Sequence, residues 1–215
     1  MTIHDLYKTI FKIWREKRMQ KFENIIDPQP LDRILDVGGY PHTWNARPQK
    51  SKSIECMNIQ LVPYDPSDFP NHQILTIEGN GCDLQYEDQS YEIAFSNSVI
   101  EHVGEWEQQI DFAKEIRRVG KRIWVQTPAL ECPIEPHYLA PFVHWFPVPL
   151  RRKVLRWSSP WGWMQKPTQV EIDQSIKFTK LLSKSQFKEL FPDCEIITER
   201  ILWIFPKSYI AYRIN

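Results

Sequence analysis

The stretch Arg33-Ile-Leu-Asp-Val-Gly-Gly39 joins a short apolar run to a pair of glycines. A run of this kind is typical of a strand that is buried on both faces, and glycines directly after it indicate a tight turn. We therefore expect the first strand of a sheet at Arg33 to Val37, with a close turn at its carboxyl end.

Four more short apolar runs follow along the chain, at 53–59, 73–77, 91–95 and 122–126. Between the last two, Val99 to Val119 carries apolar residues with helical period, and Gly120 is a natural C-terminal cap for that helix. Strands that alternate with helices favour a mostly parallel sheet. The expected fold class is therefore α/β, with a doubly wound sheet.

The two ends of the chain complete this arrangement. Ile3 to Ile26 indicates an amphipathic leading helix, which Pro28 and Pro30 stop. Ser183 to Phe191 predicts a closing helix, and two further strands are expected at 194–200 and 207–213. A strand pair joined by a short link predicts an antiparallel C-terminal edge strand, which makes a seven-stranded sheet.

Composition sets limits on class and location. The 215 residues suit one domain, and 27 basic residues match 27 acidic ones, so no overall field favours nucleic acid. No stretch approaches the roughly 18 apolar residues needed to cross a bilayer. The four cysteines are scattered at 56, 82, 132 and 194, without a zinc-ligand spacing. We expect a cytoplasmic protein with reduced thiols.

Two segments in this order, Ile34-Leu-Asp-Val-Gly-Gly39 and Tyr91-Glu-Ile-Ala-Phe-Ser-Asn-Ser-Val-Ile-Glu-His-Val103, resemble the class I S-adenosylmethionine-dependent methyltransferases, in particular the type 11 branch found in bacteria. The resemblance covers about Leu31 to Val125. It implies the Rossmann-like methyltransferase fold, S-adenosylmethionine as cofactor, and transfer of its methyl group to a small-molecule acceptor.

In that family the acidic residue and glycine after the first strand hold the methionine end of the cofactor, which Asp36 and Gly38 match, with Gly39 and Tyr40 next in the loop. A carboxylate opposite an ammonium is sensible chemistry. The same residues also fit an ordinary strand-ending turn. Nicotinamide binding is disfavoured because the third glycine of G-x-G-x-x-G is missing.

The resemblance places the ribose at the end of the second strand, where Asn58 and Ile59 stand instead of the usual acidic pattern. An amide oxygen can accept one bond from a ribose hydroxyl. A solvated strand-end asparagine is the alternative.

The loop after the third strand resembles the family's adenine-binding segment. It comprises Asn80, Gly81, Cys82 and Asp83 in the run Gly79-Asn-Gly-Cys-Asp-Leu84. A side-chain oxygen here can accept from the adenine amino group, and a loop amide can donate to a ring nitrogen. A plain glycine-asparagine turn is the competing interpretation.

The loop after the fourth strand, with Ser96 and Asn97, faces the transferable methyl group in the family. Ser98 and Glu101 also fit a helix capping box, which gives Glu101 a structural role. Next to it, His102 is a candidate for contact with cofactor or substrate.

The segment after the fifth strand is expected to lie over the cofactor, because ligands of such sheets bind beyond the carboxyl ends of the strands. Glu135 and His137 are separated by one proline, so in an extended chain they project to the same side. If the acceptor is a hydroxyl, His137 is a candidate general base that Glu135 orients. A rigid structural loop remains the alternative. His137 and His144 show no recognised metal spacing, and we predict no metal site.

Aromatic residues precede and follow a basic cluster, Arg151 to Arg156, over 142–163. They fit a lid, a contact with an anionic membrane that carries a lipid-linked acceptor, or a packed helix with solvated charges. The expected divisions of the single domain are 1–30 for the leading helix, 31–127 for the cofactor-binding half, 128–180 for a substrate or lid insertion, and 181–215 for the closing helix and strands.

The expected activity is methyl transfer to an oxygen of a sugar, a lipid-linked molecule or another metabolite. The protein is expected to act as a monomer or homodimer, without nucleic acid. A catalytically inactive cofactor-binding regulator or scaffold is the alternative, because Tyr40, Asn58 and Asn80 stand where glycine or carboxylates are usual.

Overall fold

The computed structural model describes residues 3–45 and 47–214, with side chains from Trp14 onward. Its centre is a seven-stranded sheet in the order β3-β2-β1-β4-β5-β9-β8. The strands are β1 (Arg33–Val37), β2 (Ser53–Asn58), β3 (Ile74–Glu78), β4 (Tyr91–Asn97), β5 (Gly120–Pro128), β8 (Glu195–Ile201) and β9 (Phe205–Arg213). The expected doubly wound α/β sheet is confirmed.

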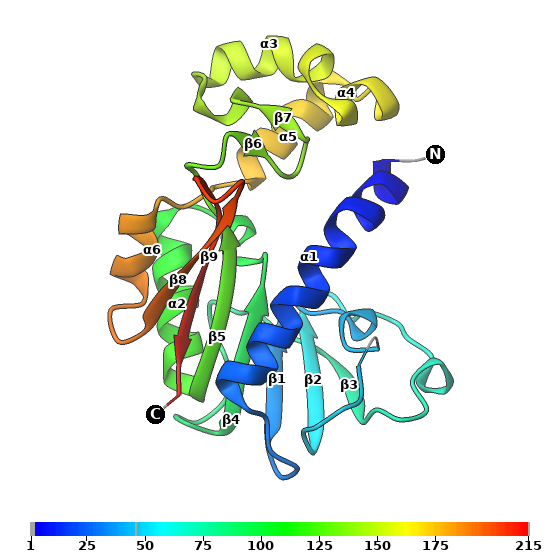
Figure 1. Cartoon of the computed structure of the whole chain (residues 1–215), viewed down its shortest axis with the longest axis vertical. Helices are drawn as coiled ribbons and strands as arrows, with labels where there is room; N and C mark the ends of the chain where they lie inside the picture. The colour runs from blue at the N-terminus through cyan, green and yellow to red at the C-terminus, as the bar shows by residue number, and fades with distance from the viewer. Residues whose placement is uncertain (1–2, 46, 215) are drawn as a thin grey trace.

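The direction of the strands also follows the expectation. Strands β1 to β5 pair in parallel, whereas β9 pairs antiparallel with both β5 and β8. The antiparallel C-terminal strand is thus present, and β8 occupies the outer position beside it (Figure 1).

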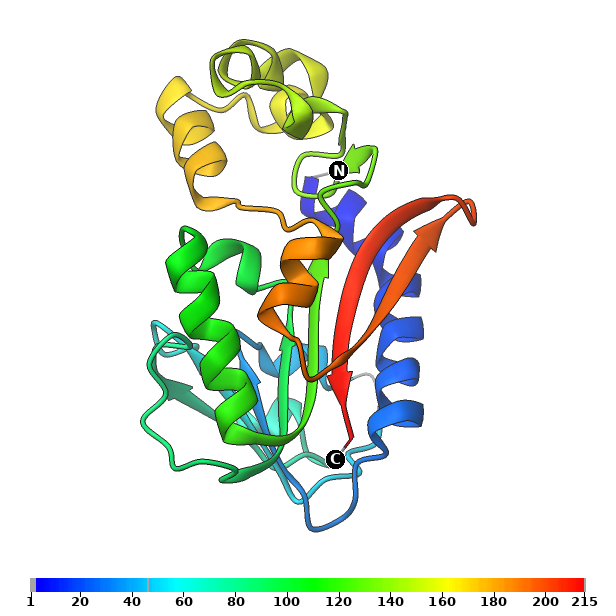
Figure 2. The same cartoon turned by 90° about the vertical axis from the view of Figure 1, so that its left-hand side faces the viewer.

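Helices cover both faces of the sheet. On one face lies α1 (Ile3–Ile26), whose Phe22 packs with Phe95 and Trp124 in one buried cluster. On the other face lies α2 (Trp106–Val119), whose Phe112 joins Leu35 in a second cluster. Figure 2 shows these two layers on either side of the strands, with α6 (Lys184–Leu190) beside α2.

A smaller unit stands beyond the carboxyl ends of the parallel strands (Figures 1 and 2). It comprises β6 (Ile134–Glu135), β7 (Ala140–Pro141), α3 (Val148–Ser158), α4 (Pro160–Gln165) and α5 (Gln169–Phe178). Tyr138, Leu155 and Ile172 belong to its own apolar cluster. We call residues 128–180 the lid segment. Short 3-10 turns occur at η1 (Pro41–Thr43), η2 (Pro66–Asp68), η3 (Ile100–His102) and η4 (Val143–Trp145).

The helix expected over Val99 to Val119 is shorter than the sequence pattern indicates. Gly104 has a φ of 136°, and this interrupts the chain between η3 and α2. The capping box of α2 is formed by Glu105 and Gln108. The predicted box of Ser98 and Glu101 was therefore wrong. Apolar period alone did not reveal the break, because η3 buries Ile100 on the same side as the helix.

No helix within residues 3–45 and 47–214 combines the length and the apolar character that a bilayer crossing requires.

Candidate active site

The strand order creates a crevice at the carboxyl ends of the sheet. The chain runs from β1 to β2 and β3 on one side and then returns to β4 on the other, so β1 and β4 flank a topological switch point. Ligands of open α/β sheets bind at such points. The carboxyl ends of β1, β2, β3 and β4 and the loops that follow them meet at this edge of the sheet, and together they contain all the residues predicted to hold the cofactor.

The loop after β1 requires its two glycines. Gly38 has a φ of 79°, and a Cβ atom added to it would lie 2.4 Å from Cγ2 of Val99. A Cβ atom on Gly39 would lie 1.9 Å from Cγ of Asp36. Any other residue would push the loop outward, so the glycines keep bare backbone at the mouth of the crevice.

Asp36 lies beneath this loop. Its carboxylate is 1 % exposed and accepts a hydrogen bond of 2.8 Å from Nε1 of Trp44. Burial raises the pKa of Asp36 to about 7, and the Trp44 hydrogen bond offsets part of this rise. The Asp36 carboxylate therefore packs under the loop that follows β1 and holds Trp44 there. A direct contact between Asp36 and the methionine end of the cofactor, as the sequence predicts, would require Gly39 and Trp44 to move.

Asn58 ties the second loop to the first. Its Nδ2 atom donates to the carbonyl oxygen of Gly39 at 2.6 Å. Because the amide nitrogen is used in this bond, the amide oxygen is the atom that can accept from a ribose hydroxyl. The next residue, Ile59, is 76 % exposed. An exposed apolar side chain at this point is consistent with a nucleoside contact, which stays a prediction.

The loop after β3 is a tight turn. Cys82 donates its backbone N–H to Oδ1 of Asn80 at 3.0 Å, and Asp83 donates its own to the carbonyl oxygen of Asn80 at the same distance. A Cβ atom on Gly81 would lie 2.7 Å from Cγ1 of Val37. The turn therefore fixes Asn80, whose Oδ1 is already engaged. Asp83 is exposed, and its Oδ1 accepts from Gln85.

The last two residues of β4, Ser96 and Asn97, place their side chains differently. Ser96 is 0 % exposed and donates to the carbonyl oxygen of Val37 at 2.9 Å. Its hydroxyl thus stabilises the β1–β4 junction, and it does not face the cavity as expected. Asn97 lies at the cavity, and its Oδ1 accepts from Nη1 of Arg18 at 2.9 Å.

Arg18 is a residue that the sequence analysis did not single out. From α1 it also donates to Oε1 of Gln126 at 2.7 Å and pairs with Glu199 at 3.0 Å. Burial raises the pKa of Glu199, but Arg18 and Lys207 outweigh that effect and lower it to about 2. The sequence does contain one indication that Arg18 faces the sheet. It lies four residues from both Trp14 and Phe22, which places a charged side chain on the apolar face of the leading helix.

A cavity of about 640 Å³ lies between these loops, α1 and the lid segment. Its wall includes Tyr40 from the loop after β1, Asn97 from the end of β4, Arg18 from α1, and His137 from the lid segment. We call it the acceptor cavity. A second cavity of about 650 Å³ lies between α2 and the lid, and none of the predicted cofactor residues lines it.

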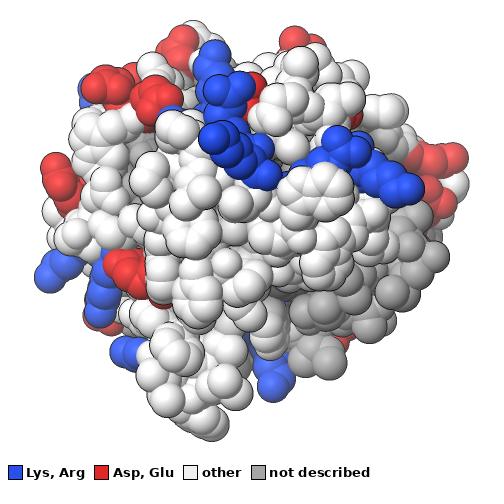
Figure 3. All heavy atoms as spheres, turned by 90° about the horizontal axis from the view of Figure 1, so that it is seen from above, with Lys and Arg blue, Asp and Glu red and all other residues white. Residues whose placement is uncertain are grey.

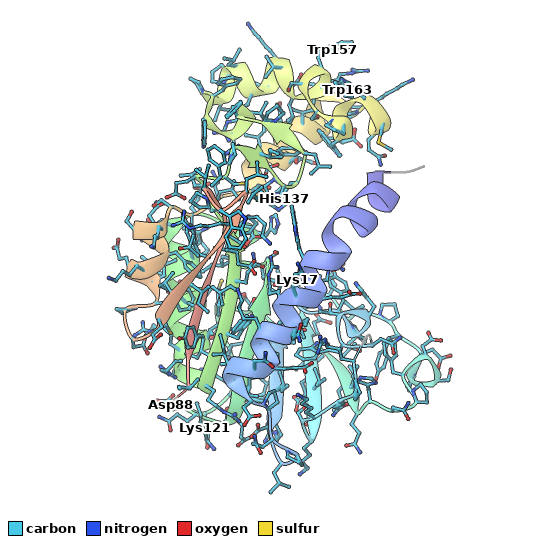
Figure 4. All side chains as sticks on the ribbon, in the orientation of Figure 1. Lys17, Asp88, Lys121, His137, Trp157 and Trp163 are labelled. Carbon is cyan, nitrogen blue, oxygen red and sulfur yellow. The ribbon has the colours of Figure 1, made fainter. Side chains whose placement is uncertain are left out.

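The two lid residues predicted to act together are in contact. Nδ1 of His137 lies 2.6 Å from Oε1 of Glu135, and Oε2 of Glu135 accepts from the backbone N–H of Tyr138. Burial lowers the pKa of His137, but the carboxylates of Glu135 and Glu101 outweigh it, so the net pKa is raised. Figure 4 shows His137 at the junction of the lid and the strand ends.

His102 joins this pair from η3. Its Nε2 lies 3.0 Å from Nε2 of His137, and its Nδ1 lies 3.1 Å from the carbonyl oxygen of Phe178. Beside it, Glu101 is 0 % exposed and accepts from Oγ1 of Thr127 at 2.9 Å. The sequence pattern favoured a capping box for Glu101, whereas its carboxylate lies within 4.8 Å of donor nitrogens of both histidines.

Comparison with known proteins agrees with this arrangement. Residues 48–122 match the family model described as a methyltransferase domain. The YcgJ protein of Bacillus subtilis is 12 % identical, with 92 % of this chain and 95 % of that chain covered and a TM-score of 0.54. For the MccD protein the identity is 9 %, the coverage 86 % and 73 %, and the TM-score 0.55.

A SAM-dependent methyltransferase from Aquifex aeolicus has 12 % identity over 92 % of this chain and 87 % of its own, with a TM-score of 0.50. No protein of curated function matches the sequence. These structural likenesses show the fold, and the family match is confined to residues 48–122. Together with the crevice at the β1–β4 switch point, they give the chain the Rossmann-like methyltransferase fold, with similarity to a methyltransferase domain over residues 48–122.

Proposed function

We propose that the enzyme transfers the methyl group of S-adenosylmethionine to a hydroxyl oxygen of a small molecule held in the acceptor cavity. The observation that carries this proposal is the position of His137, which lines the same cavity as Tyr40 and Asn97 of the cofactor loops. A group able to take a proton thus shares one space with the loops that present the methyl group.

The cofactor is proposed to lie across the four loops, with ribose at Asn58, adenine at the turn of Asn80 to Asp83, and sulfur toward the acceptor cavity. Methyl transfer needs the sulfur, the methyl carbon and the acceptor oxygen in line, and positioning alone can contribute roughly 7–11 kcal/mol. Residues 128–180 close the cavity from above and supply its specificity.

The proton of the acceptor hydroxyl is proposed to leave through the cluster of Glu135, His137 and His102. Glu135 accepts from Nδ1 of His137, so Nε2, which lies 3.0 Å from Nε2 of His102, is the nitrogen proposed to take the proton. General base assistance of this kind typically contributes about 10²–10⁴ in rate. Glu135 acts as a positioning residue, since His137 lies between it and the cavity.

The chemical class of the product tests this proposal. S-adenosylmethionine with a radioactive methyl group is incubated with the enzyme and with low-mass and lipid extracts of the source cells. We expect label in a molecule from which dilute alkali does not release it, as for a methyl ether. Label found only in protein, in nucleic acid, or in an alkali-labile ester would contradict the proposal.

A lipid-linked acceptor is the second candidate, because the lid segment has the surface chemistry of a membrane contact. Residues 136–170 contain no Asp or Glu, and Trp157 and Trp163 are 72 % and 61 % exposed. Figure 4 shows both tryptophans at the outer side of the lid, and Figure 3 shows basic side chains beside a broad uncharged surface there. Amphipathic rings beside basic groups suit an anionic bilayer surface.

Co-sedimentation with vesicles tests this second candidate. We expect the protein to pellet with vesicles that contain phosphatidylglycerol and not with pure phosphatidylcholine, and expect the double variant Trp157→Ala, Trp163→Ala to lose most of this binding. Leu31→Ala is the matched control, because Leu31 is 82 % exposed at the opposite end of the sheet. Equal sedimentation of all variants would rule out a lid contact.

A further inference from the structure

We propose that Glu101, His102 and His137 bind one divalent transition-metal ion at the edge of the acceptor cavity. Each of the three offers a donor atom, and these atoms all lie within 4.8 Å of one another. The residues come from two separate parts of the chain, η3 and the lid segment, so the fold assembles the set.

The Nδ1 atom of each imidazole already has an acceptor, and this fixes which nitrogen faces the other ring. A carbonyl oxygen only accepts, so His102 donates its Nδ1–H to Phe178, and the Glu135 carboxylate likewise accepts from Nδ1 of His137. In the neutral rings both Nε2 atoms then carry lone pairs, and they lie 3.0 Å apart. Histidines that bind metals show this same pattern, with the second ring nitrogen donating to a carboxylate or a carbonyl group.

The third donor is a buried carboxylate. Glu101 is 0 % exposed, and Thr127 holds its Oε2. Its Oε1 has no hydrogen-bond partner among the described residues. A buried carboxylate oxygen without a partner is unfavourable, and a cation between it and the two imidazoles would remove that penalty.

The donor types indicate the class of metal. Two imidazoles and one carboxylate suit zinc and the neighbouring divalent transition metals, whereas magnesium and calcium prefer oxygen donors alone. Donors bound at about 2.0–2.2 Å lie roughly 3.3–3.6 Å apart around a tetrahedral ion. The two Nε2 atoms, 3.0 Å apart, are a few tenths of an ångström short of this spacing, so a small shift of the exposed His102 ring would reach it.

Three protein donors leave a coordination position for a ligand from the cavity, as in catalytic zinc sites. This consequence rests on the proposed function. An acceptor hydroxyl bound to the ion loses its proton to solvent water more readily, and the ion then replaces His137 as the group that ionises it. The oxygen pair forms the new C–O bond, while the C–S bond breaks and its electron pair stays on sulfur.

The sequence expectation of no metal site considered His137 together with His144. The partners proposed here lie 35 and 36 positions before His137, so no local spacing reveals them.

Metal titration of the full chain tests the inference without cofactor or acceptor. The protein is freed of its purification tag and treated with a chelator, and Zn²⁺ is then added in a calorimeter; Co²⁺ is added in parallel to record its visible absorption. We expect one ion per chain, with affinity at least about tenfold weaker in His102→Ala and in Glu101→Gln. His72→Ala is the control: His72 contacts the backbone of Arg47 and is not part of the proposed site, so this variant should bind the ion like the parent.

Absence of saturable binding, or equal affinity in the parent and in His102→Ala, would overturn the inference. His102→Ala replaces an exposed ring, so it keeps the test decisive if Glu101→Gln fails to fold. Methyl transfer to oxygen that survives complete chelation would refute the metal's role in ionising the acceptor and leave the proposed function intact. Saturable zinc binding in a protein that methylates no oxygen would leave the metal site standing and refute the proposed function.

Discussion

Nδ1 of His137 lies 2.6 Å from Oε1 of Glu135, and Pro136 between them restricts the backbone that holds the two side chains in contact. The carboxylate itself is 1 % exposed and is held a second time by the backbone N–H of Tyr138. The lid segment therefore presents one imidazole in a fixed orientation at the cavity.

Replacing that imidazole should separate catalysis from cofactor binding. In His137→Ala we expect kcat to fall by about 10²–10⁴, because the group that removes or helps to ionise the hydroxyl proton is lost. The affinity for S-adenosylhomocysteine should stay within about twofold, since His137 belongs to the lid. The rate of S-adenosylhomocysteine release measures kcat, and calorimetry measures the affinity for S-adenosylhomocysteine. An unchanged kcat would remove His137 from the reaction.

Asp36 should make stability depend on pH in an unusual direction. Its pKa in the folded protein is about 7, above the 3.8 of an unperturbed side chain, so the folded state binds the proton more tightly. Its contribution is complete below about pH 4 and is lost as the pH rises through about 7. Burial also raises the pKa of the neighbouring Cys56, which keeps that thiol protonated over this range.

The variant Asp36→Asn removes this dependence while keeping an oxygen for Trp44. We therefore expect it to gain on the order of a few kcal/mol relative to the parent at pH 8, and much less at pH 4, in urea unfolding. An equal difference at both pH values would show that Asp36 does not titrate in this range.

Arg18 should couple the leading helix to the strand ends. In Arg18→Ala the oxygen of Asn97 loses this donor, and that of Gln126 keeps the Ser98 hydroxyl. Glu199 loses its arginine partner and keeps two lysines and the Ser208 hydroxyl. We expect a loss of about 1–3 kcal/mol in unfolding free energy. Lys17→Ala, one position away on the same helix, is the control and should change stability by less than about 0.5 kcal/mol. Similar losses in the two variants would argue against the buried network.

Asn58 should contribute to cofactor binding through its amide oxygen and through the loop it holds. In Asn58→Ala the bond to Gly39 is lost together with the proposed ribose acceptor. We expect S-adenosylhomocysteine to bind about 5- to 30-fold more weakly, which corresponds to about 1–2 kcal/mol. Gln60→Ala, at an exposed side chain two residues away, is the calorimetric control and should bind normally.

Much of the fold follows from local sequence. The run Arg33–Val37 and the strands after it are short, apolar and punctuated by glycine or polar loops, and their order sets the sheet. The break at Gly104 was not foreseen, because the apolar side chains keep helical period across it while the backbone does not.

The sequence could indicate those candidate site residues that lie at a strand end. It could not indicate those that come together only because distant segments pack. Asn58 and Asn97 are the last residues of their strands, so the resemblance could assign both to this edge of the sheet. The contacts of Arg18 with Asn97 and of His102 with His137 join residues 79 and 35 positions apart. Such pairs depend on the packing of α1 and of the lid, which no local pattern encodes. The burial of Ser96 and Asp36 likewise reflects side-chain direction at the sheet ends.

A structure of the protein with S-adenosylhomocysteine bound would show directly whether the strand ends hold the cofactor as proposed. We expect ribose hydroxyls at Asn58, adenine at the turn of Asn80 to Asp83, and the sulfur facing the cavity that His137 lines. A nucleoside found instead in the cavity between α2 and the lid, or a sulfur turned away from His137, would contradict this placement.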